Sequence, residues 1–438
     1  MSDSPNDDDV IDRAMTEEIA DAGVAGPSAP VTEEGEVEHS GLPIRTPQYG
    51  GLHWLGRVLV FAIPLGYLLI RVFGVTGIAG DGWSNSGLGL LADALIIAIA
   101  VMGVNLITGY TGQLSIGHAA FFAIGAFTAL ILTQGKVSTP FFGEENLWDP
   151  GWTLPVAGVV CFVVGCLVGL PALRLSGIYL ALTTLVFVEA VRSILKYEEF
   201  AGVTGGATGI KGDKYTPPEY VFDFFGIKLP TGLDGRGDLN QWMIYLSLGL
   251  LLLIMLMVSG LIRSRIGRAM VATRDNELAA EVMGVNLAVI KTVAFGLSGA
   301  ITGVAGALFG LKLGLAEADI PLFGLFGAIT FLVAMVVGGA AQIWGPMVGA
   351  VFYVFVNELA RSVGENPSES IFSFAFDEGT KLDGLGGVIF GILLILFARF
   401  APFGAVGTFR IIRSKLVQVI PKPPAGSLAA RAMAAEDD

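Results

Sequence analysis

Residues Gly109–Phe127 read GYTGQLSIGHAAFFAIGAF and combine four glycines with Gln113, Ser115 and His118 inside an otherwise apolar region. Glycine weakens a helix, and polar side chains avoid lipid. Irregular backbone at membrane depth survives only when it is buried in protein or lines a water-filled path. The stretch therefore predicts a bendable hinge at Gly109–Gly117, followed by a helix that turns its polar side away from lipid.

Two interpretations of this stretch remain open. In the first, it lines or gates a translocation path; in the second, it is a packed helix whose polar groups bond to neighbouring helices. Asn105, in the preceding apolar segment, allows the same two interpretations. The candidate path or hinge residues are Asn105, Gly109, Gly112, Gln113, Ser115, Gly117 and His118.

The composition of the whole chain predicts an all-α polytopic membrane protein. Of its 438 residues 53% are hydrophobic and 15% charged, and its mean hydropathy is +0.69. Soluble domains are about 45–50% apolar and about 25% charged. A spanning helix needs about 20 apolar residues. About ten candidates follow, at 55–75, 87–108, 113–133, 153–173, 177–196, 242–262, 289–312, 323–341, 344–362 and 384–402.

Most of the net charge of −13 lies in the first 44 residues, which hold twelve acidic residues and a single base, Arg13. Such a segment lacks the apolar residues that a core requires. We expect residues 1–50 to form an acidic, disordered cytoplasmic tail, either solvated without a specific role or used for regulation or docking. Residues 51–405 would form the transmembrane domain, and 406–438 a C-terminal cytoplasmic tail.

Basic residues set the expected orientation, because short cytoplasmic flanks are rich in Arg and Lys. Residues 263–274 contain four arginines, and the flank after residue 398 is also basic. Placing both in the cytoplasm puts the N- and C-termini inside. The loop 197–241 carries four bases on the opposite side and argues against this orientation.

Patterns that would indicate catalysis or a bound cofactor are missing from the sequence. A phosphate-binding loop needs Lys followed by Ser or Thr, and Gly135-Lys136 is followed by Val137. The three histidines and two cysteines cannot build a metal cluster, and Cys161 and Cys166 are expected to be small buried side chains. We expect no enzymatic activity, no cofactor, no metal and no nucleic-acid partner.

A second polar stretch, RSRIGRAMVATRDNELAAEVMGVNLAVIK, occupies Arg263–Lys291. Its part at about 273–284 predicts an amphipathic helix at the cytoplasmic face, capped by Asp275 or Asn276 and ended by Gly284. Such a helix either lies in the lipid headgroup layer or fits a groove of a partner protein.

Charged pairs within the apolar segments are few. Glu189 and Arg192 are three residues apart, as are Glu358 and Arg361, and such spacing places opposite charges on one helix face. No lone acid lies convincingly at the centre of a span, which weakens the prediction of a proton-coupled secondary transporter. The glycine-rich TGGATGI, Thr204–Ile210, predicts either a tight turn or a loop that contacts a ligand.

Three stretches together resemble the permease subunits of bacterial branched-chain amino acid ABC transporters. They are GVNLITGYTGQLSIGHAAFFAIGAF at Gly103–Phe127, LRLSGIYLALTTLVFVEAVR at Leu173–Arg192, and IGRAMVATRDNELAAEVMGVNLAVIKTVAFGLSGAITGVAGALFG at Ile266–Gly310. Their order and spacing match the family, and the long gap between the fifth and sixth spans is similar to the larger, M-type permease. The tails lie outside the resemblance.

The resemblance implies a multi-pass plasma (inner) membrane permease driven by separate subunits. The helix at about 273–284 would be the coupling helix that contacts the ATPase, through Arg274, Glu277, Ala279, Ala280 and Gly284. Two ABC ATPase subunits, a second related permease and an extracytoplasmic solute-binding protein would be the partners. The small-molecule substrate would be a branched-chain amino acid or, as in related permeases, urea or a short amide. A self-sufficient secondary transporter is the alternative from another class.

Overall fold

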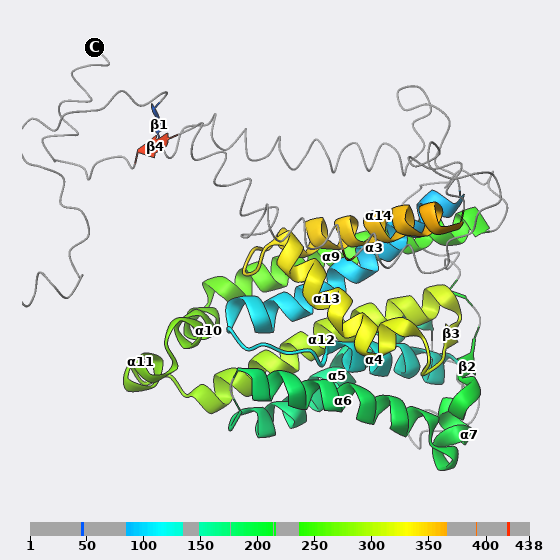
Figure 1. Cartoon of the computed structure of the whole chain (residues 1–438), viewed down its shortest axis with the longest axis horizontal. Helices are drawn as coiled ribbons and strands as arrows, with labels where there is room; N and C mark the ends of the chain where they lie inside the picture. Colours follow the sequence, from blue (N-terminus) through cyan, green and yellow to red (C-terminus); the bar gives the residue numbers. More distant parts are fainter. Residues whose placement is uncertain are drawn as a thin grey trace, which may run out of the picture. The chain divides into compact units, whose positions relative to one another are not determined.

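The computed structural model describes residues 85–134, 149–175, 177–212, 214–215 and 236–365, together with 45–47, 391 and 418–420. Contacts divide the chain into two units, Met1–His53 with Ser414–Asp438, and Trp54–Arg413. In the first unit, β1 (Arg45–Pro47) pairs in parallel with β4 (Gln418–Ile420), with Arg45 opposite Gln418. The described helices belong to the second unit (Figure 1).

Eight long or medium apolar helices correspond to eight of the expected spans. They are α3 (Asn85–Val104), α4 (His118–Thr133), α5 (Pro150–Ala172), α6 (Ile178–Lys196), α9 (Arg236–Arg263), α12 (Leu287–Leu313), α13 (Leu325–Gly338) and α14 (Gly345–Glu365). Within the described residues, five stretches, beginning at Leu88, Pro150, Ile178, Leu239 and Leu287, are long and apolar enough to cross a membrane. This confirms an all-α membrane protein, and the count of ten spans stays a prediction.

Several expectations lie outside the described residues. The spans at 55–75 and 384–402 do so, as do the acidic tail apart from β1, the C-terminal tail apart from β4, and the side chains of Glu358 and Arg361. The domain boundaries near residues 50 and 405 therefore stay predictions.

Helix α12 occupies the centre of the second unit and packs against α5, α4 and α3. Glycine permits the closest of these approaches. A Cβ atom on Gly125 would overlap the carbonyl of Gly303, and one on Gly306 would overlap the carbonyl of Phe122. Small residues let membrane helices bring their backbones into contact, where dispersion forces replace the hydrophobic effect that lipid abolishes.

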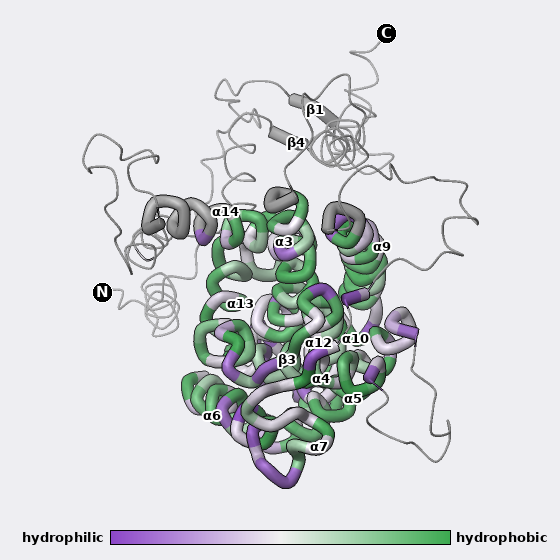
Figure 2. The backbone as a smooth tube through the Cα atoms, turned by 90° about the vertical axis from the view of Figure 1, so that its right-hand side faces the viewer, coloured by the Kyte–Doolittle hydropathy of each residue, from purple (hydrophilic) through white to green (hydrophobic). Residues whose placement is uncertain are grey.

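Helix α3 is the most enclosed helix of the unit, because α9, α12, α13 and α14 all pack against it. Ile96, Ile99 and Met102 have no exposed surface. By contrast, α5 and α6 expose large apolar side chains, among them Leu167 and Val186. Figure 2 shows apolar residues along the helices and hydrophilic residues at α10 (Arg265–Asp275) and near α7 (Ala201–Thr204).

The unit has two distinct ends. The α11 end contains α10 and α11 (Glu277–Val282), which directly precede α12. The α7 end contains α7, the 3-10 turns at Glu198–Phe200 (η2), Gly206–Thr208 (η3) and Pro321–Phe323 (η4), and the antiparallel pair β2 (Ile210–Lys211) and β3 (Leu315–Ala316). Because α12 has 27 residues, about 40 Å separates its ends. Figure 1 shows α11 and α7 at opposite ends.

Candidate functional site

The glycine-rich stretch interrupts the bundle. Helix α3 continues into a π-helix, η1 (Asn105–Tyr110), and the backbone from Thr111 to Gly117 is not helical. Helix α4 begins at His118, so a helix starting near Gln113 was the wrong expectation: the turn at Gly112, with φ +72°, stops it. Single π-turns often mark functional positions, because they insert one residue into a regular helix.

The side chain of Asn105 is fully buried and ties η1 to the loop between α13 and α14. Its Nδ2 donates to the carbonyl oxygen of Gln342 at 2.9 Å. Its Oδ1 accepts from the backbone N–H of Ala341 at 2.8 Å. Ala341 has φ +57°, a conformation that costs a non-glycine residue about 1–2 kcal/mol. The Asn105 amide therefore helps to hold a strained loop in place.

We call residues 105–118, with η1 and the non-helical stretch, the break. Polar groups within the break bond to each other and to α6. The Ser115 hydroxyl lies 3.4 Å from Nδ1 of His118, and the N–H of Ile116 donates to the Thr184 hydroxyl at 3.0 Å. Among the residues that the structure describes, His118 Nε2 and both amide atoms of Gln113 are buried without a protein hydrogen-bond partner. These atoms are available to water or to a polar ligand.

An apolar groove of about 360 Å³ lies beside this polar cluster, between α5 and α6. Helix α5 contributes Leu167 and Val168 to its lining, and α6 contributes Leu180, Thr184 and Phe187. The ring of Phe187 lies 5.4 Å from that of Phe121, three residues after His118. The non-helical stretch thus lies close to a surface that suits an apolar side chain.

The second sequence stretch forms two short helices rather than the single one expected at about 273–284. Residues Thr273–Asp275 end α10, and only Glu277–Val282 form α11. Asn276 interrupts the helix because its extended backbone lets its side chain accept from the N–H of Ala279 at 3.0 Å. The expected cap at Asn276 and the end at Gly284, which has φ +85°, are both present.

The α11 docking face consists of Leu278, Val282 and Met283. These side chains are 75%, 87% and 84% exposed. Ala280 points into the protein and is 3% exposed, whereas Ala279 is exposed. Exposed apolar side chains at this position suit either the lipid headgroup layer or a groove of a partner protein.

Polar ties fix α11 and the end of α10 to the bundle. The carboxylate of Glu277 accepts from Nζ of Lys291 at 2.7 Å, and the Lys291 side chain is 7% exposed. At the end of α10, Arg274 bonds Asp275 at 2.9 Å and donates from Nη1 to the carbonyl of Gly109 at 3.3 Å. Arg274 and Glu277 therefore bond the protein's own residues while staying partly exposed. The apolar side chains of the α11 docking face share the exposed surface with the acidic Glu281.

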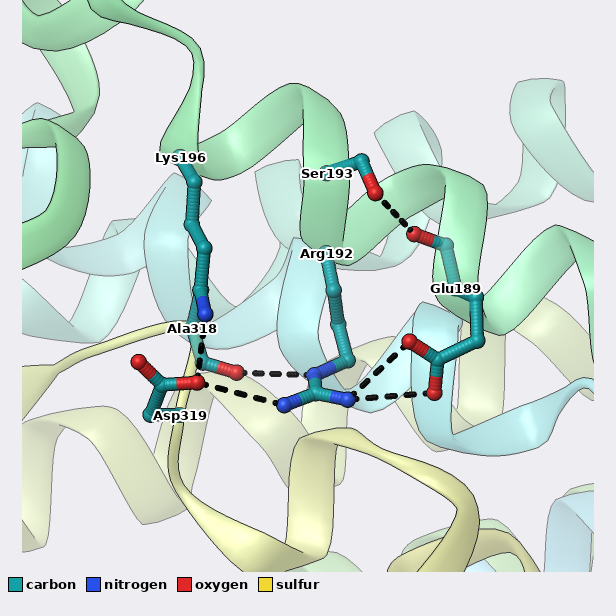
Figure 3. A network of polar contacts seen from close by, with 6 residues as sticks. All are labelled: Glu189, Arg192, Ser193, Lys196, Ala318 and Asp319. Atoms are coloured by element: carbon teal, nitrogen blue, oxygen red, sulfur yellow. Dashed lines mark hydrogen bonds and ion pairs between the residues drawn. The ribbon is translucent and has the colours of Figure 1, made fainter.

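An ion-pair network at the α7 end ties α6 to the loop after β3 (Figure 3). Arg192 pairs with Glu189 at 3.0 Å, as the spacing predicted, and also with Asp319 at 3.3 Å. Its Nε donates to the Ala318 carbonyl at 3.0 Å, and Lys196 Nζ lies 2.5 Å from Asp319. The hydrogen bond and charge of Lys196, with the charge of Arg192, hold the pKa of the Asp319 carboxyl below its ordinary value.

Sequence reasoning also missed a partly buried ion pair. Lys312 Nζ lies 2.6 Å from Asp93 and donates to the carbonyl of Gly89 at 2.7 Å, joining the end of α12 to α3. The Lys312 side chain is 13% exposed. An acid inside an apolar segment was the available signal, because such residues are rare unless paired. Its partner lies 219 residues away and could not be identified from spacing.

Membrane-length helices packed around a buried polar break, with a short exposed helix at one end, define an integral membrane protein of the multi-pass class. Comparison with known families identifies which one. The model described as branched-chain amino acid transport system / permease component matches residues 87–398, and the chain belongs to this family. It is a multi-pass protein of the plasma (inner) membrane.

Individual relatives agree with the family. The high-affinity branched-chain amino acid transport system permease protein LivM of Salmonella typhimurium is 32% identical over 304 residues, covering 64% of this chain and 65% of that protein. The Escherichia coli protein of the same name is 33% identical, with 62% and 63% covered. A probable LivM permease of Methanocaldococcus jannaschii is 27% identical, with 81% and 92% covered.

The chain thus spans slightly less than two thirds of the two bacterial relatives it matches. No solved structure matches the chain.

Proposed function

We propose that the chain is the permease subunit of an ABC importer for branched-chain, hydrophobic amino acids, driven by ATP hydrolysis on separate subunits. The α11 docking face carries this proposal. It presents two exposed apolar side chains on the six-residue helix α11 and a third, Met283, directly after it. Helix α11 is tied to α12 by Glu277 and precedes this central helix in sequence. A short, firmly held helix of this kind suits a groove in a partner.

The remaining partners follow from the names of the relatives and from the family resemblance. Two ATPase subunits, a second related permease and an extracytoplasmic solute-binding protein would complete the importer. Exposed apolar side chains along α5 and α6 support contact with lipid or with the second permease. The translocation path would pass the break at residues 105–118, where the buried atoms of Gln113 and His118 have spare hydrogen-bonding capacity.

The same proposal includes ten spans with both termini in the cytoplasm, which places the α11 end inside and the α7 end outside. The arginines 263, 265, 268 and 274 support it. Single cysteines at Val282 and Val203, in a chain without Cys161 and Cys166, test the orientation. A membrane-impermeant maleimide added to intact cells should label position 203 and spare position 282. The reverse pattern would overturn the orientation.

An apolar substrate side chain is favoured over urea. The groove beside the break is lined by aliphatic and aromatic residues, with the two hydroxyls of Thr183 and Thr184. Urea would give up hydrogen bonds to water there without replacing them, whereas a leucine side chain would gain by burial. Uptake of labelled leucine by cells expressing the complete importer should exceed uptake of labelled urea. A preference for urea would overturn the substrate assignment.

Affinity purification tests the docking role directly. Val282→Asp places a charge at the centre of the α11 docking face and should reduce the co-purified ATPase at least tenfold, because the carboxylate would be desolvated in an apolar contact. Val203→Asp, at an exposed position of the α7 end, is the matched control and should retain the ATPase. Wild-type amounts of ATPase with Val282→Asp would exclude this face as the docking site.

A further inference from the structure

Arg274 lies between the ends of two helices. It occupies the last turn of α10, and its Nη1 donates to the carbonyl of Gly109, next to the last residue of η1. The last carbonyls of a helix lack intrahelical partners and carry partial negative charge, so a guanidinium suits both helix ends. Asp275 holds the guanidinium through Nε at 3.0 Å and Nη2 at 2.9 Å. The Arg274 side chain is therefore held between Asp275 and the Gly109 carbonyl, with 34% of it exposed.

Close packing reinforces this contact. A Cβ atom on Gly112 would lie 2.7 Å from Cγ of Arg274, so the aliphatic part of Arg274 rests directly on the backbone of the Gly112 turn. The left-handed conformation of Gly112 also excludes most other residues. Any displacement of α10 consequently pushes or pulls on the backbone between Gly109 and Gly112.

From Gly109 the contacts continue to the loop between α13 and α14. A Cβ atom on Gly109 would overlap Oδ1 of Asn105 and lie 2.6 Å from the N–H nitrogen of Ala341. Asn105 in turn bonds Ala341 and Gln342. The contacts form one chain from α10, through Gly109 and Asn105, to the strained loop between α13 and α14.

A second ion pair, between Glu277 and Lys291, joins α11 to α12. Helix α12 is a continuous 27-residue helix. A continuous helix resists bending, whereas a π-turn followed by irregular backbone can change its hydrogen-bond register. Of the two ties, the one through Arg274 is therefore the one that ends on a deformable element.

On the basis of the proposed function, we propose that Arg274 is a positioning residue that couples α11 to the break and to the α13–α14 loop. Movement of the docked α11 would be transmitted by Arg274 to the backbone at 109–112 and by Asn105 to residues 341–342. The site that responds to the ATPase would thus be the break itself together with residues 341–342, which follow the end of α11 at Val282 by 59 and 60 residues.

Hydrogen exchange with mass spectrometry tests this coupling in the complete complex, co-purified with its ATPase subunits in nanodiscs, with and without MgATP. In the wild type, MgATP should change exchange by at least threefold in peptides covering 105–112 and 339–344. With Arg274→Ala, peptides covering 277–283 should remain protected by the ATPase, but the MgATP response at the other two positions should disappear. Arg274→Lys keeps a cation near Gly109 and should retain part of the MgATP response at residues 105–112 and 339–344.

Arg268→Ala is the matched control. Arg268 lies on the same helix, is exposed, and bonds the nearby carbonyl of Arg263 at 2.8 Å, so its loss should leave the MgATP response intact. Gly112→Ala keeps the guanidinium but displaces Cγ, and should weaken the response as Arg274→Ala does.

The possible outcomes separate this proposal from the docking proposal. If peptides covering 277–283 are unprotected in the wild-type complex, the docking proposal fails. If they are protected but Arg274→Ala responds to MgATP like the wild type, or the wild type shows no response at 105–112 and 339–344, the coupling role of Arg274 fails alone. In the expected case, leucine transported per ATP hydrolysed also falls at least tenfold with Arg274→Ala.

Discussion

Single side chains determine how the break in the bundle is held, and Asn105 is the most informative. Its position in an apolar segment indicated either an interhelical hydrogen bond or a place on the path, and the structure shows hydrogen bonds to the α13–α14 loop. The partners could not be predicted, because they are backbone atoms more than 230 residues away. By contrast, the glycines at 109, 112 and 117 mark the break in the sequence itself.

Replacing Asn105 by Leu should destabilise the protein. The Ala341 N–H and the Gln342 carbonyl would each lose a partner, at about 1–3 kcal/mol per buried group. The midpoint of thermal unfolding, measured on purified protein in detergent, should fall by several degrees, since about 1 kcal/mol corresponds to about 2–4 °C in proteins of 150–250 residues.

Thr128→Val serves as the comparison for Asn105→Leu. The Thr128 hydroxyl bonds the Ile124 carbonyl of its own helix at 2.7 Å, and that carbonyl keeps its helical partner when the hydroxyl is lost. The unfolding midpoint of Thr128→Val should change by about 1–2 °C at most. Equal midpoints for the two variants would show that the Asn105 amide does not stabilise the loop.

At the scale of elements, hydropathy located eight described helices to within a few residues, because membrane spans need long apolar runs. The start of α4 was placed five residues too early, since apolar Leu114 and Ile116 continue the pattern through a segment that the Gly112 turn prevents from being helical. The split between α10 and α11 was also missed. Asn276 was predicted as a cap, and it does cap α11. The sequence did not show that residues before Asn276 form a separate helix, α10, because that depends on the contacts of α10 and α11 with the rest of the bundle.

The ion pairs at the α7 end should make the loop after β3 sensitive to acid. Asp319→Asn should speed hydrogen exchange in peptides covering 314–324 at pH 7, by a modest factor because the pairs are exposed and screened by salt. The pKa of Asp319 is lowered in the folded protein, so its contribution is complete above the ordinary carboxyl pKa. It is lost as the pH falls through the lowered folded value.

Exchange measured over a pH series checks this sign, after correction for the intrinsic rate. The wild type and Asp319→Asn should differ from pH 7 down to about pH 4 and converge in stronger acid. Ser193 lies on α6 beside Arg192, and its hydroxyl donates to the Glu189 carbonyl of the same helix. Exchange in Ser193→Ala should therefore match exchange in the wild type. A wild-type loop whose exchange equals that of Asp319→Asn at pH 7 would show that the ion pairs do not hold it.

At the scale of the whole molecule, the family was recognisable from three motifs in order, and the family model confirms it. The motifs could not show that Arg274 and Glu277 bond the protein's own residues while Leu278, Val282 and Met283 face outward. Which face of a six-residue helix points outward depends on contacts with η1 and α12, and these are set by tertiary packing rather than by local pattern. The outward position of Leu278, Val282 and Met283 is therefore known only from the structure, whereas the three motifs already indicate the family.

The central claim is that the chain is a passive path driven by ATP on other subunits. Its most direct test is uptake of labelled leucine into vesicles that contain either this chain alone or the complete importer with its solute-binding protein, with ATP on the ATPase side. The account predicts ATP-dependent accumulation only with the complete importer, unaffected by collapse of ion gradients. Accumulation by the chain alone, driven by an imposed ion gradient and abolished when that gradient is collapsed, would contradict it.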